Sequence, residues 1–368
     1  MASPQRTAPA RRSSGGDVAL LDGGPAAYPR MLAAIAAAAH HVRLEVYAFA
    51  HDGVGRRFVE ALAAAARRGV RVAVVIDGWG SAADGREVAA LLRDAGCEVA
   101  VYNPLAALLA GRFRRNHRKI LLVDDAVAFL GGINVGDAYG RPGEPGGARW
   151  LDLALEIRGP VAVWLAERLA HRRAPAPPGP LRVHLSGLGG GRALRRRYLK
   201  ALGAARAEVR IAHAYFLPDR RLVRSITAAA RRGVAVTLLL PGVSDVPFAR
   251  AATRRLYRQL LRAGVRIHEW QETVLHAKVA VADRRRLLLG SFNLDPFSLA
   301  NLETLVEVND PALAGEAAAW MDRIVAGARP VSEREVAAQP RVARWLLDAV
   351  GLAVLRVAYR IARLLASR

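Results

Sequence analysis

Cysteine and lysine, two residues with distinctive chemistry, are scarce in this sequence. Its 368 residues include one cysteine, Cys97, which excludes a disulfide framework and a cysteine-rich zinc module. No stretch reaches about 18 consecutive uncharged apolar residues, the length that a membrane-spanning helix needs. The N-terminal region has no apolar run longer than residues 18–21, which is too short for the core of a signal peptide. We therefore expect no membrane span and a reducing, cytosolic setting.

Arginine supplies almost all of the positive charge. Lysine and arginine number 55 against 32 aspartates and glutamates, a formal charge of +23, yet only Lys119, Lys200 and Lys278 are lysines. Such a charge favours a polyanionic partner, either nucleic acid or an anionic membrane surface, although solvated surface arginines explain it equally well. A lysine that is kept against this bias indicates a need for a compact charge.

The chain contains an internal repeat. VRLEVYAF (residues 42–49) and VRIAHAYF (residues 209–216) are each followed by an amphipathic segment with the shared block AAARRGV, at residues 64–70 and 228–234. Each half therefore reads as strand, helix, glycine-ended turn and strand, the βαβ pattern of a parallel sheet covered by helices. The proline-rich residues 171–180 predict a linker, and we place the boundary between the halves near residue 176.

A second repeated block carries the polar residues. NHRKILLVDDAVAFLGGIN (residues 116–134) and LHAKVAVADRRRLLLGSFN (residues 275–293) share His-x-Lys, then Asp, then Gly-Gly/Ser-x-Asn at identical spacing. The matched residues are His117, Lys119, Asp124, Gly131, Gly132 and Asn134 in the first block and His276, Lys278, Asp283, Gly290, Ser291 and Asn293 in the second. A single His-x-Lys pair would be ordinary surface decoration. Its recurrence, with two of the three lysines at equivalent places, predicts a functional site.

These residue types suit displacement at a phosphodiester. Residues two apart on a strand point to the same face, so each block sets an imidazole beside an ammonium group. Two facing blocks would supply one imidazole to attack phosphorus and a protonated one to donate to the leaving oxygen. The lysines and asparagines would stabilise the negative oxygens. Because no segment has the spacing of a metal site, we expect neither a metal nor a cofactor.

The two blocks resemble the paired HxKxxxxD motifs of the phospholipase D superfamily. More narrowly, LEVYAFAHDGVGRRFVEAL, ARRGVRVAVVIDGWGS and GSFNLDPFSLANLE resemble bacterial cardiolipin synthases of the shorter, soluble-type branch, and the similarity extends over roughly residues 18–325. The resemblance implies two tandem α/β/α halves with mixed central sheets, related by a pseudo-twofold axis, with one active site between them.

The same resemblance implies roles for individual residues. His117 would be the nucleophile that forms a covalent phosphatidyl-histidine, and His276 would act as acid and later as base. The phosphate ligands would be Lys119, Lys278, Asn134 and Asn293, and the supporting acids Asp124 and Asp283. Asp152 and Glu303 match the downstream acids that orient the histidines, and which acid serves which histidine stays open.

We expect four segments along the chain. They are a disordered basic N-terminus (residues 1–17), a first phospholipase D-like half (18–175), a second half (176–330) and an amphipathic C-terminal segment (331–368). On a helical wheel the charged residues of the last segment fall within one half; they are Arg341, Arg344, Asp348, Arg356, Arg360 and Arg363. The pattern predicts a helix lying in the interface of an anionic membrane, with packing on the protein as the alternative.

The expected activity is phosphatidyl transfer at the cytoplasmic face of the cell membrane. His117 would take a phosphatidyl group from phosphatidylglycerol and pass it to a second phosphatidylglycerol, giving cardiolipin. The alternatives are a phosphodiester hydrolase, a nuclease and a non-catalytic membrane adaptor. Nucleic acid is not expected as a partner because small nucleases of the superfamily carry one motif per chain and no basic platform is interleaved with aromatic residues. The acceptor alcohol and the oligomeric state stay open.

Overall fold

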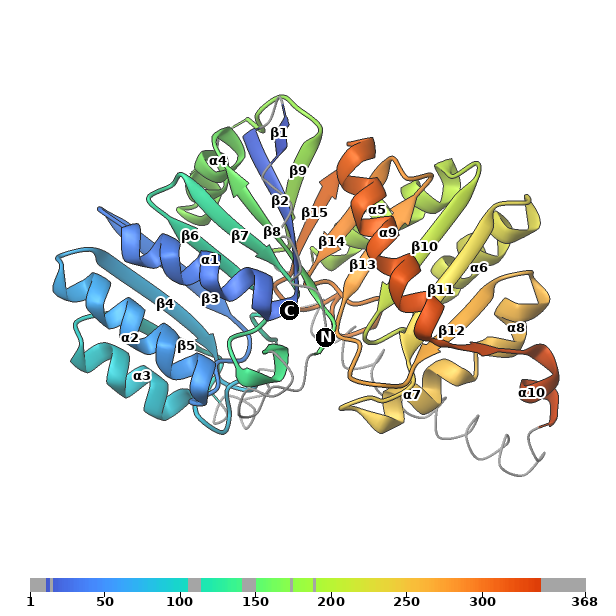
Figure 1. The fold of residues 1–368 in the computed structure, drawn as a ribbon, viewed down its shortest axis with the longest axis horizontal. Helices are drawn as coiled ribbons and strands as arrows, with labels where there is room; N and C mark the ends of the chain where they lie inside the picture. The colour runs from blue at the N-terminus through green and yellow to red at the C-terminus, as the bar shows by residue number, and fades with distance from the viewer. Residues whose placement is uncertain are drawn as a thin grey trace, which may run out of the picture. The chain divides into compact units, whose positions relative to one another are not determined.

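The computed structural model describes residues 11–13, 16–104, 114–140, 150–172, 175–187 and 190–338 (Figure 1). The chain falls into two compact units that divide between Val183 and His184, close to the expected boundary near residue 176. The predicted amphipathic helix at residues 341–367 lies outside the described residues. Within the described part of the chain, no helix has the length and apolar character needed to cross a membrane.

The first unit is built on a mixed sheet with the strand order β1-β2-β8-β7-β6-β3-β4-β5. Strands β3, β4 and β5 are parallel, and the other neighbours are antiparallel. The strands are β1 (Arg11–Ser13), β2 (Gly16–Asp22), β3 (His41–Val46), β4 (Arg71–Asp77), β5 (Glu98–Tyr102), β6 (Ile120–Val123), β7 (Val127–Gly131) and β8 (Leu153–Arg158). The helices are α1 (Gly23–Ala37), α2 (Gly53–Arg67), α3 (Gly85–Asp94), the short 3-10 helix η2 (Asp137–Tyr139) and α4 (Pro160–Leu169).

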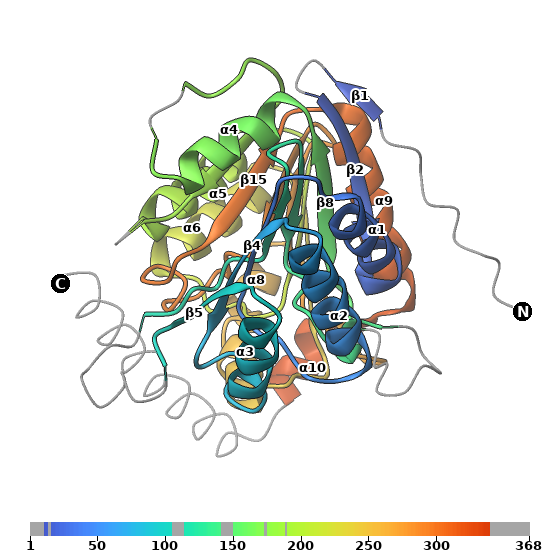
Figure 2. The same ribbon diagram turned by 90° about the vertical axis from the view of Figure 1, so that its left-hand side faces the viewer.

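Helices α1, α2 and α3 lie side by side over one face of this sheet, as Figure 2 shows. Phe58 and Leu62 of α2 are fully buried against the strands. Asp52 caps α2, because its side chain accepts a hydrogen bond from the Gly55 N–H. Cys97 belongs to the same core, with its Sγ 3.9 Å from the carbonyl oxygen of Leu62, and burial raises the pKa of its thiol.

The second unit has a mixed sheet with the strand order β16-β12-β11-β10-β13-β14-β15-β9. The strands are β9 (Leu181–Leu185), β10 (Glu208–His213), β11 (Ala235–Pro241), β12 (Arg266–Trp270), β13 (Lys278–Ala282), β14 (Arg286–Gly290), β15 (Thr304–Val308) and β16 (Arg329–Val331). The helices are α5 (Gly191–Ala204), α6 (Arg220–Arg231), α7 (Pro247–Arg254), α8 (Tyr257–Arg262), α9 (Pro311–Gly327) and α10 (Glu333–Ala338). Side chains of α5, α6 and α8 pack with the strands in one core.

The two sheets repeat one topology. Read from β2, the first sheet runs β2-β8-β7-β6-β3-β4-β5, and read from β9, the second runs β9-β15-β14-β13-β10-β11-β12. The strands correspond pairwise in chain order, and the central hairpin β6–β7 matches β13–β14. The prediction of two similar α/β halves with mixed sheets is therefore confirmed.

The prediction of disorder over residues 1–17 is wrong in part. Residues 11–13 form β1 and β2 begins at Gly16, with Arg11 opposite Val18 and Arg12 opposite Asp17. Strand β2 pairs with β8 on its other side, so without β1 it would present a row of unpaired backbone groups. Pairing those groups orders the short basic segment.

Candidate active site

In the first unit, strand register brings the predicted site residues to one edge of the sheet. Ile120 of β6 lies between Glu45 of β3 and Leu130 of β7, and Gly131 lies opposite Ala154 of β8. The segments just beyond these pairs therefore leave the sheet at one edge. They carry Tyr47, His117, Lys119, Gly132 and Asp152. Neighbouring strands are about 4.8 Å apart, so these side chains are neighbours.

The histidine and lysine of the first block are buried and in contact with one tyrosine. His117 and Lys119 are 7% and 4% exposed, and Lys119 Nζ donates to the carbonyl oxygen of His117 at 2.9 Å. The ring of Tyr47 meets the imidazole edge-on, with 4.7 Å between ring centres, and Lys119 Nζ lies 5.0 Å from the centre of the same ring. Tyr47 therefore restrains both the imidazole and the ammonium group.

A polar clamp holds the residue before His117. Asp77 is fully buried and accepts from the backbone N–H of Asn116 at 2.8 Å, while Asn116 Nδ2 donates to Glu45 at 3.1 Å. Burial raises the pKa of Asp77 against the opposing effect of its backbone donors. Sequence reasoning missed these three residues, because their counterparts in the second half are Pro241, Leu275 and Ala212 and the repeat gives no signal for them.

Gly132 is required by the carboxylate of Asp152. A Cβ added at Gly132 would lie 2.3 Å from Asp152 Oδ1, so a larger residue must displace the carboxylate. The second unit solves the same position differently, because Ser291 stands in place of Gly132 and its Oγ donates to Glu303 Oε2 at 2.5 Å. Asp152 is thus paired with a glycine that leaves room for it, and Glu303 with a serine that donates to it.

The Gly132→Ser variant should lose activity by about 10 to 100-fold, because the new side chain moves Asp152 away from its place. Initial rates at saturating substrate would measure the loss. Gly315→Ser is the matched control, since a Cβ added at Gly315 would meet no atom within 4 Å. Equal rates for Gly132→Ser and the parent would contradict the role given to this contact.

The second block is buried more deeply. His276 is 5% exposed and Lys278 is completely buried. Lys278 Nζ lies 2.8 Å from His276 Nδ1 and 3.1 Å from Nε2 and also donates to the carbonyl oxygen of His276. Tyr215 meets the His276 ring edge-on with 6.4 Å between ring centres, and its hydroxyl donates to Asp245 at 2.5 Å. Each histidine therefore has an edge-on tyrosine, which sequence comparison of the halves missed because Tyr47 and Tyr215 are offset by one position.

Lys278 has a further buried neighbour. His213 ends β10 directly opposite Lys278 in the strand register and is completely buried. Its Nε2 lies 3.3 Å from the hydroxyl of Tyr198, and its Nδ1 has no hydrogen-bond partner among the described residues. Burial, reinforced by the charge of Lys278, lowers the pKa of His213 to about 3. A neutral ring therefore stands beside the buried ammonium group.

The two asparagines differ in how their side chains are used. Asn134 Oδ1 accepts from the Ala48 N–H at 3.2 Å, and its Nδ2 donates one hydrogen to the Tyr139 hydroxyl at 2.9 Å. Asn293 is 3% exposed, its backbone N–H donates to Ser298, and its Oδ1 has no partner among the described residues. The side chain of Asn134 thus links the loop that carries Ala48 to the loop that carries Tyr139. These two contacts use only one of the two hydrogens of its amide.

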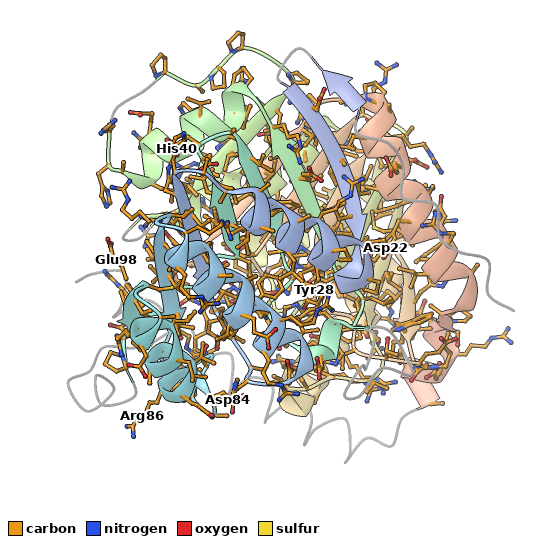
Figure 3. All side chains as sticks on the ribbon, turned by 60° about the vertical axis from the view of Figure 1, so that its left-hand side comes forward. Asp22, Tyr28, His40, Asp84, Arg86 and Glu98 are labelled. Atoms are coloured by element: carbon orange, nitrogen blue, oxygen red, sulfur yellow. The ribbon has the colours of Figure 1, made fainter. Side chains whose placement is uncertain are left out.

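The aspartates of the repeated motif do not lie with the histidines, which corrects the prediction that Asp124 and Asp283 are supporting acids of the site. Lys119 precedes β6 and Asp124 follows it, so about 16 Å of extended chain separates them. Asp283 stands in the same relation to Lys278, at the far end of β13. Asp124 lies at the sheet edge where β3 begins, and Asp283 lies at the sheet edge where β10 begins. Figure 3 shows the two ends of the first unit, with His40 before β3 and Asp84 in the loop after β4.

Each aspartate instead closes a hairpin and caps a turn. Asp124 has a left-handed backbone (φ 48°), and its carboxylate accepts the N–H groups of Ala39, His40 and His41, each at 2.8 Å. Asp283 (φ 51°) does the same for residues 206–208. Burial alone would raise the pKa of Asp124, but the three backbone donors outweigh it and lower the pKa. Aspartate suits this position because it tolerates the left-handed region and accepts several hydrogen bonds.

Asp124→Ala should therefore lower stability rather than catalysis. Loss of three hydrogen bonds to a charged acceptor is expected to lower the free energy of unfolding by about 2 to 3 kcal/mol at pH 7. Urea unfolding followed by circular dichroism would measure it. The neighbouring Asp125→Ala, which removes only the contact of Asp125 with His41 Nε2 at 2.7 Å, is the control and should lower it less. A rate per folded molecule that falls as far as it does on replacing His117 by alanine would restore Asp124 to the site.

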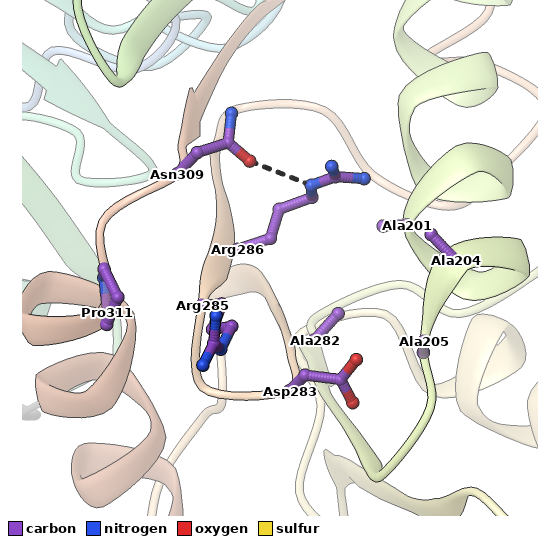
Figure 4. A pocket seen from close by; sticks show the side chains of 9 residues that line it. All are labelled: Ala201, Ala204, Ala205, Ala282, Asp283, Arg285, Arg286, Asn309 and Pro311. Carbon is purple, nitrogen blue, oxygen red and sulfur yellow. Dashed lines mark hydrogen bonds between the residues drawn. The ribbon is translucent and has the colours of Figure 1, made fainter.

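A cavity of the second unit lies at this far edge. It has a volume of about 290 Å³ and is lined by residues of α5, of the β13–β14 hairpin and of the start of α9, including Asp283 and Arg286 (Figure 4). Arg286 donates to Asn309 across it at 3.0 Å. Because His276 lies beyond the opposite end of β13, this cavity is not the reaction site. Among the described residues, no group of three or more His, Cys, Asp or Glu side chains could hold a metal ion.

Comparison with known proteins gives the family. The family model described as cardiolipin synthase, PLD-like domain, matches residues 31–139 and 198–325. Cardiolipin synthase B of Salmonella typhi is 36% identical over 320 residues, covering 80% of this chain and 77% of its own. Cardiolipin synthase B of Escherichia coli K12 is 35% identical with the same coverage.

The fold is found in a solved structure as well. Phosphatidylserine synthase of Haemophilus influenzae superposes with a TM-score of 0.75 over 96% of both chains, at 14% identity. At that identity the likeness concerns the fold alone. The chain has two units of the same mixed α/β topology, and each unit buries a His-x-Lys pair at the corresponding edge of its own sheet. Together with the family match, these features define an enzyme of the phospholipase D superfamily. With these relatives, the chain belongs to the cardiolipin synthase family, whose members are phosphatidyltransferases.

Proposed function

We propose that this enzyme makes cardiolipin from two molecules of phosphatidylglycerol through a covalent phosphohistidine, with both His-x-Lys pairs acting on the same phosphorus atom. The observation that carries the proposal is that each unit buries a His-x-Lys pair, restrained by a tyrosine, at the same edge of the same topology. Relatives named cardiolipin synthase B support the choice of substrates.

In the first half-reaction, His117 attacks the phosphorus of phosphatidylglycerol and the phosphorus–oxygen bond to glycerol breaks. His276 gives its proton to the departing oxygen, and glycerol leaves. In the second, the hydroxyl of another phosphatidylglycerol gives its proton to His276 and attacks phosphorus, and the bond to His117 breaks. Atoms and charges balance over the cycle, which yields one cardiolipin and one glycerol.

The lysines and asparagines act on charge rather than on protons. Lys119, Lys278, Asn134 and Asn293 are proposed to bind the non-bridging oxygens, whose negative charge grows in the transition state. Lys278 Nζ lies 2.8 Å from His276 Nδ1, so the position of this lysine and the proton on the ring are coupled. An arriving phosphodiester attracts Lys278 and leaves His276 able to take up the proton that it later donates. Asp152 and Glu303 are proposed to orient the histidines.

The proposed setting is the surface of the cell membrane, on its cytoplasmic side. Phosphatidylglycerol is an anionic lipid of the bilayer, and a chain of charge +23 is attracted to such a surface. The predicted helix at residues 341–367 is proposed to add an apolar contact with it. Deletion of residues 341–368 should lower flotation with phosphatidylglycerol vesicles, and unchanged flotation would remove the helix from the proposal.

A product assay tests the function. The purified full chain, given phosphatidylglycerol labelled in its acyl chains and in its glycerol headgroup, should form diphosphatidylglycerol and release one glycerol for each. The alternative of a phosphodiester hydrolase differs only in using water for the second step, and it predicts phosphatidic acid as the sole lipid product. Formation of neither lipid would overturn both.

A further inference from the structure

The loop after β4 exposes an aromatic side chain at the edge of the sheet that carries His117. Trp79 is 43% exposed, although it lies only two residues beyond the end of the strand. The backbone of the loop is fixed, because the carboxylate of Asp77 accepts the N–H groups of Trp79 at 2.9 Å and Gly80 at 3.0 Å. The indole is therefore presented on a fixed backbone and is accessible to a partner.

A cation backs this indole. The guanidinium carbon of Arg115 lies 4.4 Å from the centre of the Trp79 ring, and Arg115 also donates to the Tyr47 hydroxyl at 3.3 Å. Among the described residues that follow, 114–123 contain no aspartate or glutamate and include Arg114, Arg115 and Arg118, while Lys119 is buried. The partner of this surface must therefore offer both an apolar layer and negative charge.

The second unit exposes apolar residues at the equivalent edge. Val243, two residues after the end of β11, stands at the position that corresponds to Trp79 and is 44% exposed. Phe297, in the loop that follows β14, is 36% exposed. The other exposed large apolar side chains of the described residues, Leu91 and Val163, lie on helices α3 and α4. Helix α4 begins just after Arg158, at the far edge of the first sheet.

We propose that the loop carrying Trp79 docks on an anionic phospholipid bilayer, with the indole in the interfacial layer and Arg115 against headgroup phosphates, and that Val243 makes the equivalent contact from the second unit. Tryptophan and arginine are the side chains that such an interface accepts, because each has an apolar or planar body and a polar end. The inference rests on the proposed function, since it brings the membrane to the edge that holds His117. It is separate from the predicted C-terminal helix, which lies elsewhere in the chain.

Vesicle binding by the full chain tests the docking surface. Trp79→Ser should lower the partition coefficient onto vesicles of phosphatidylglycerol and phosphatidylcholine by about tenfold, because binding scales with the apolar area that enters the interface. Val243→Ser should lower it less, since valine buries less area. Val163→Ser is the matched control, because Val163 is 50% exposed on α4, and it should bind like the parent. Equal partition of Trp79→Ser and Val163→Ser would overturn the proposal.

Fluorescence quenching gives a second, independent reading. Vesicles with bromine-labelled acyl chains should quench part of the tryptophan emission of the parent, and Trp79→Phe should remove that part while keeping an aromatic ring in the loop. If Trp79→Ser does not fold, this conservative variant decides the question. Quenching that is the same in the parent and in Trp79→Phe would show that the indole does not enter the bilayer, and a protein partner would then be the better candidate. Neither measurement needs turnover, so their outcome is distinct from that of the product assay.

Discussion

Replacement of either His117 or His276 by alanine is expected to lower phosphatidyl transfer by about a thousandfold or more, because each removes a group that makes or breaks a bond to phosphorus. The two losses should not add in the double variant, since the residues act in one reaction. Initial rates of diphosphatidylglycerol formation from labelled phosphatidylglycerol would measure all three variants.

His40→Ala is the control for these variants. His40 is exposed and lies in the turn before β3, at the far edge of the first sheet, so its replacement should leave the rate unchanged. A rate within tenfold of the parent in either His117→Ala or His276→Ala would contradict a mechanism that uses both imidazoles. Full activity in only one of them would assign the chemistry to a single unit.

Val46 is the residue of the first unit that corresponds to His213. Replacement of His213 by valine should make the free energy of unfolding fall less steeply as the pH drops below 6.5. The pKa of His213 falls from 6.5 to about 3, so between these values the unfolded chain binds a proton that the folded chain does not. Stability therefore falls as the pH drops through this window, by about 1.4 kcal/mol per pH unit from this group. Above pH 6.5 this group adds no further pH dependence to the free energy of unfolding.

Urea unfolding at a series of pH values between 7 and 4 would measure this effect as the difference between the parent and His213→Val. By pH 4 the difference in the free energy of unfolding should have changed by about 3 kcal/mol in favour of the variant. His268→Val is the matched control, because burial also lowers the pKa of His268, which is only half-buried. We expect a smaller change in this variant. Parallel pH curves for the parent and His213→Val would show that the buried ring is not the source.

The repeat in the sequence predicted two similar α/β halves, but it predicted parallel sheets, and the mixed order of the strands was expected only from the family resemblance. Each half places strand, helix and strand around the block AAARRGV, and short helices and strands with this order have few ways to pack. The pairing of Gly132 with Asp152 and of Ser291 with Glu303 could not be predicted, because it depends on which side chains of neighbouring strands touch. Register, which the sequence leaves open, decides that contact.

The same repeat misled the prediction for the motif aspartates. Identical spacing in both halves indicates a shared constraint, and for Asp124 and Asp283 this constraint is the turn that each one closes. The four buried residues of β6 between Lys119 and Asp124 were visible in the sequence and could have placed the two at opposite ends of a strand. In contrast, Glu45 and Asp77 occur in one half only, so a comparison of the halves could not find them.

The burial of Cys97 in the first core makes the chain a convenient object for site-directed spectroscopy. A thiol that is shielded from solvent and held protonated reacts slowly with maleimides and methanethiosulfonates. A cysteine introduced on the surface can therefore carry a spin label or a fluorophore without prior removal of the native one. Labels placed in the two units would report the distance between them in solution and its change on adding lipid.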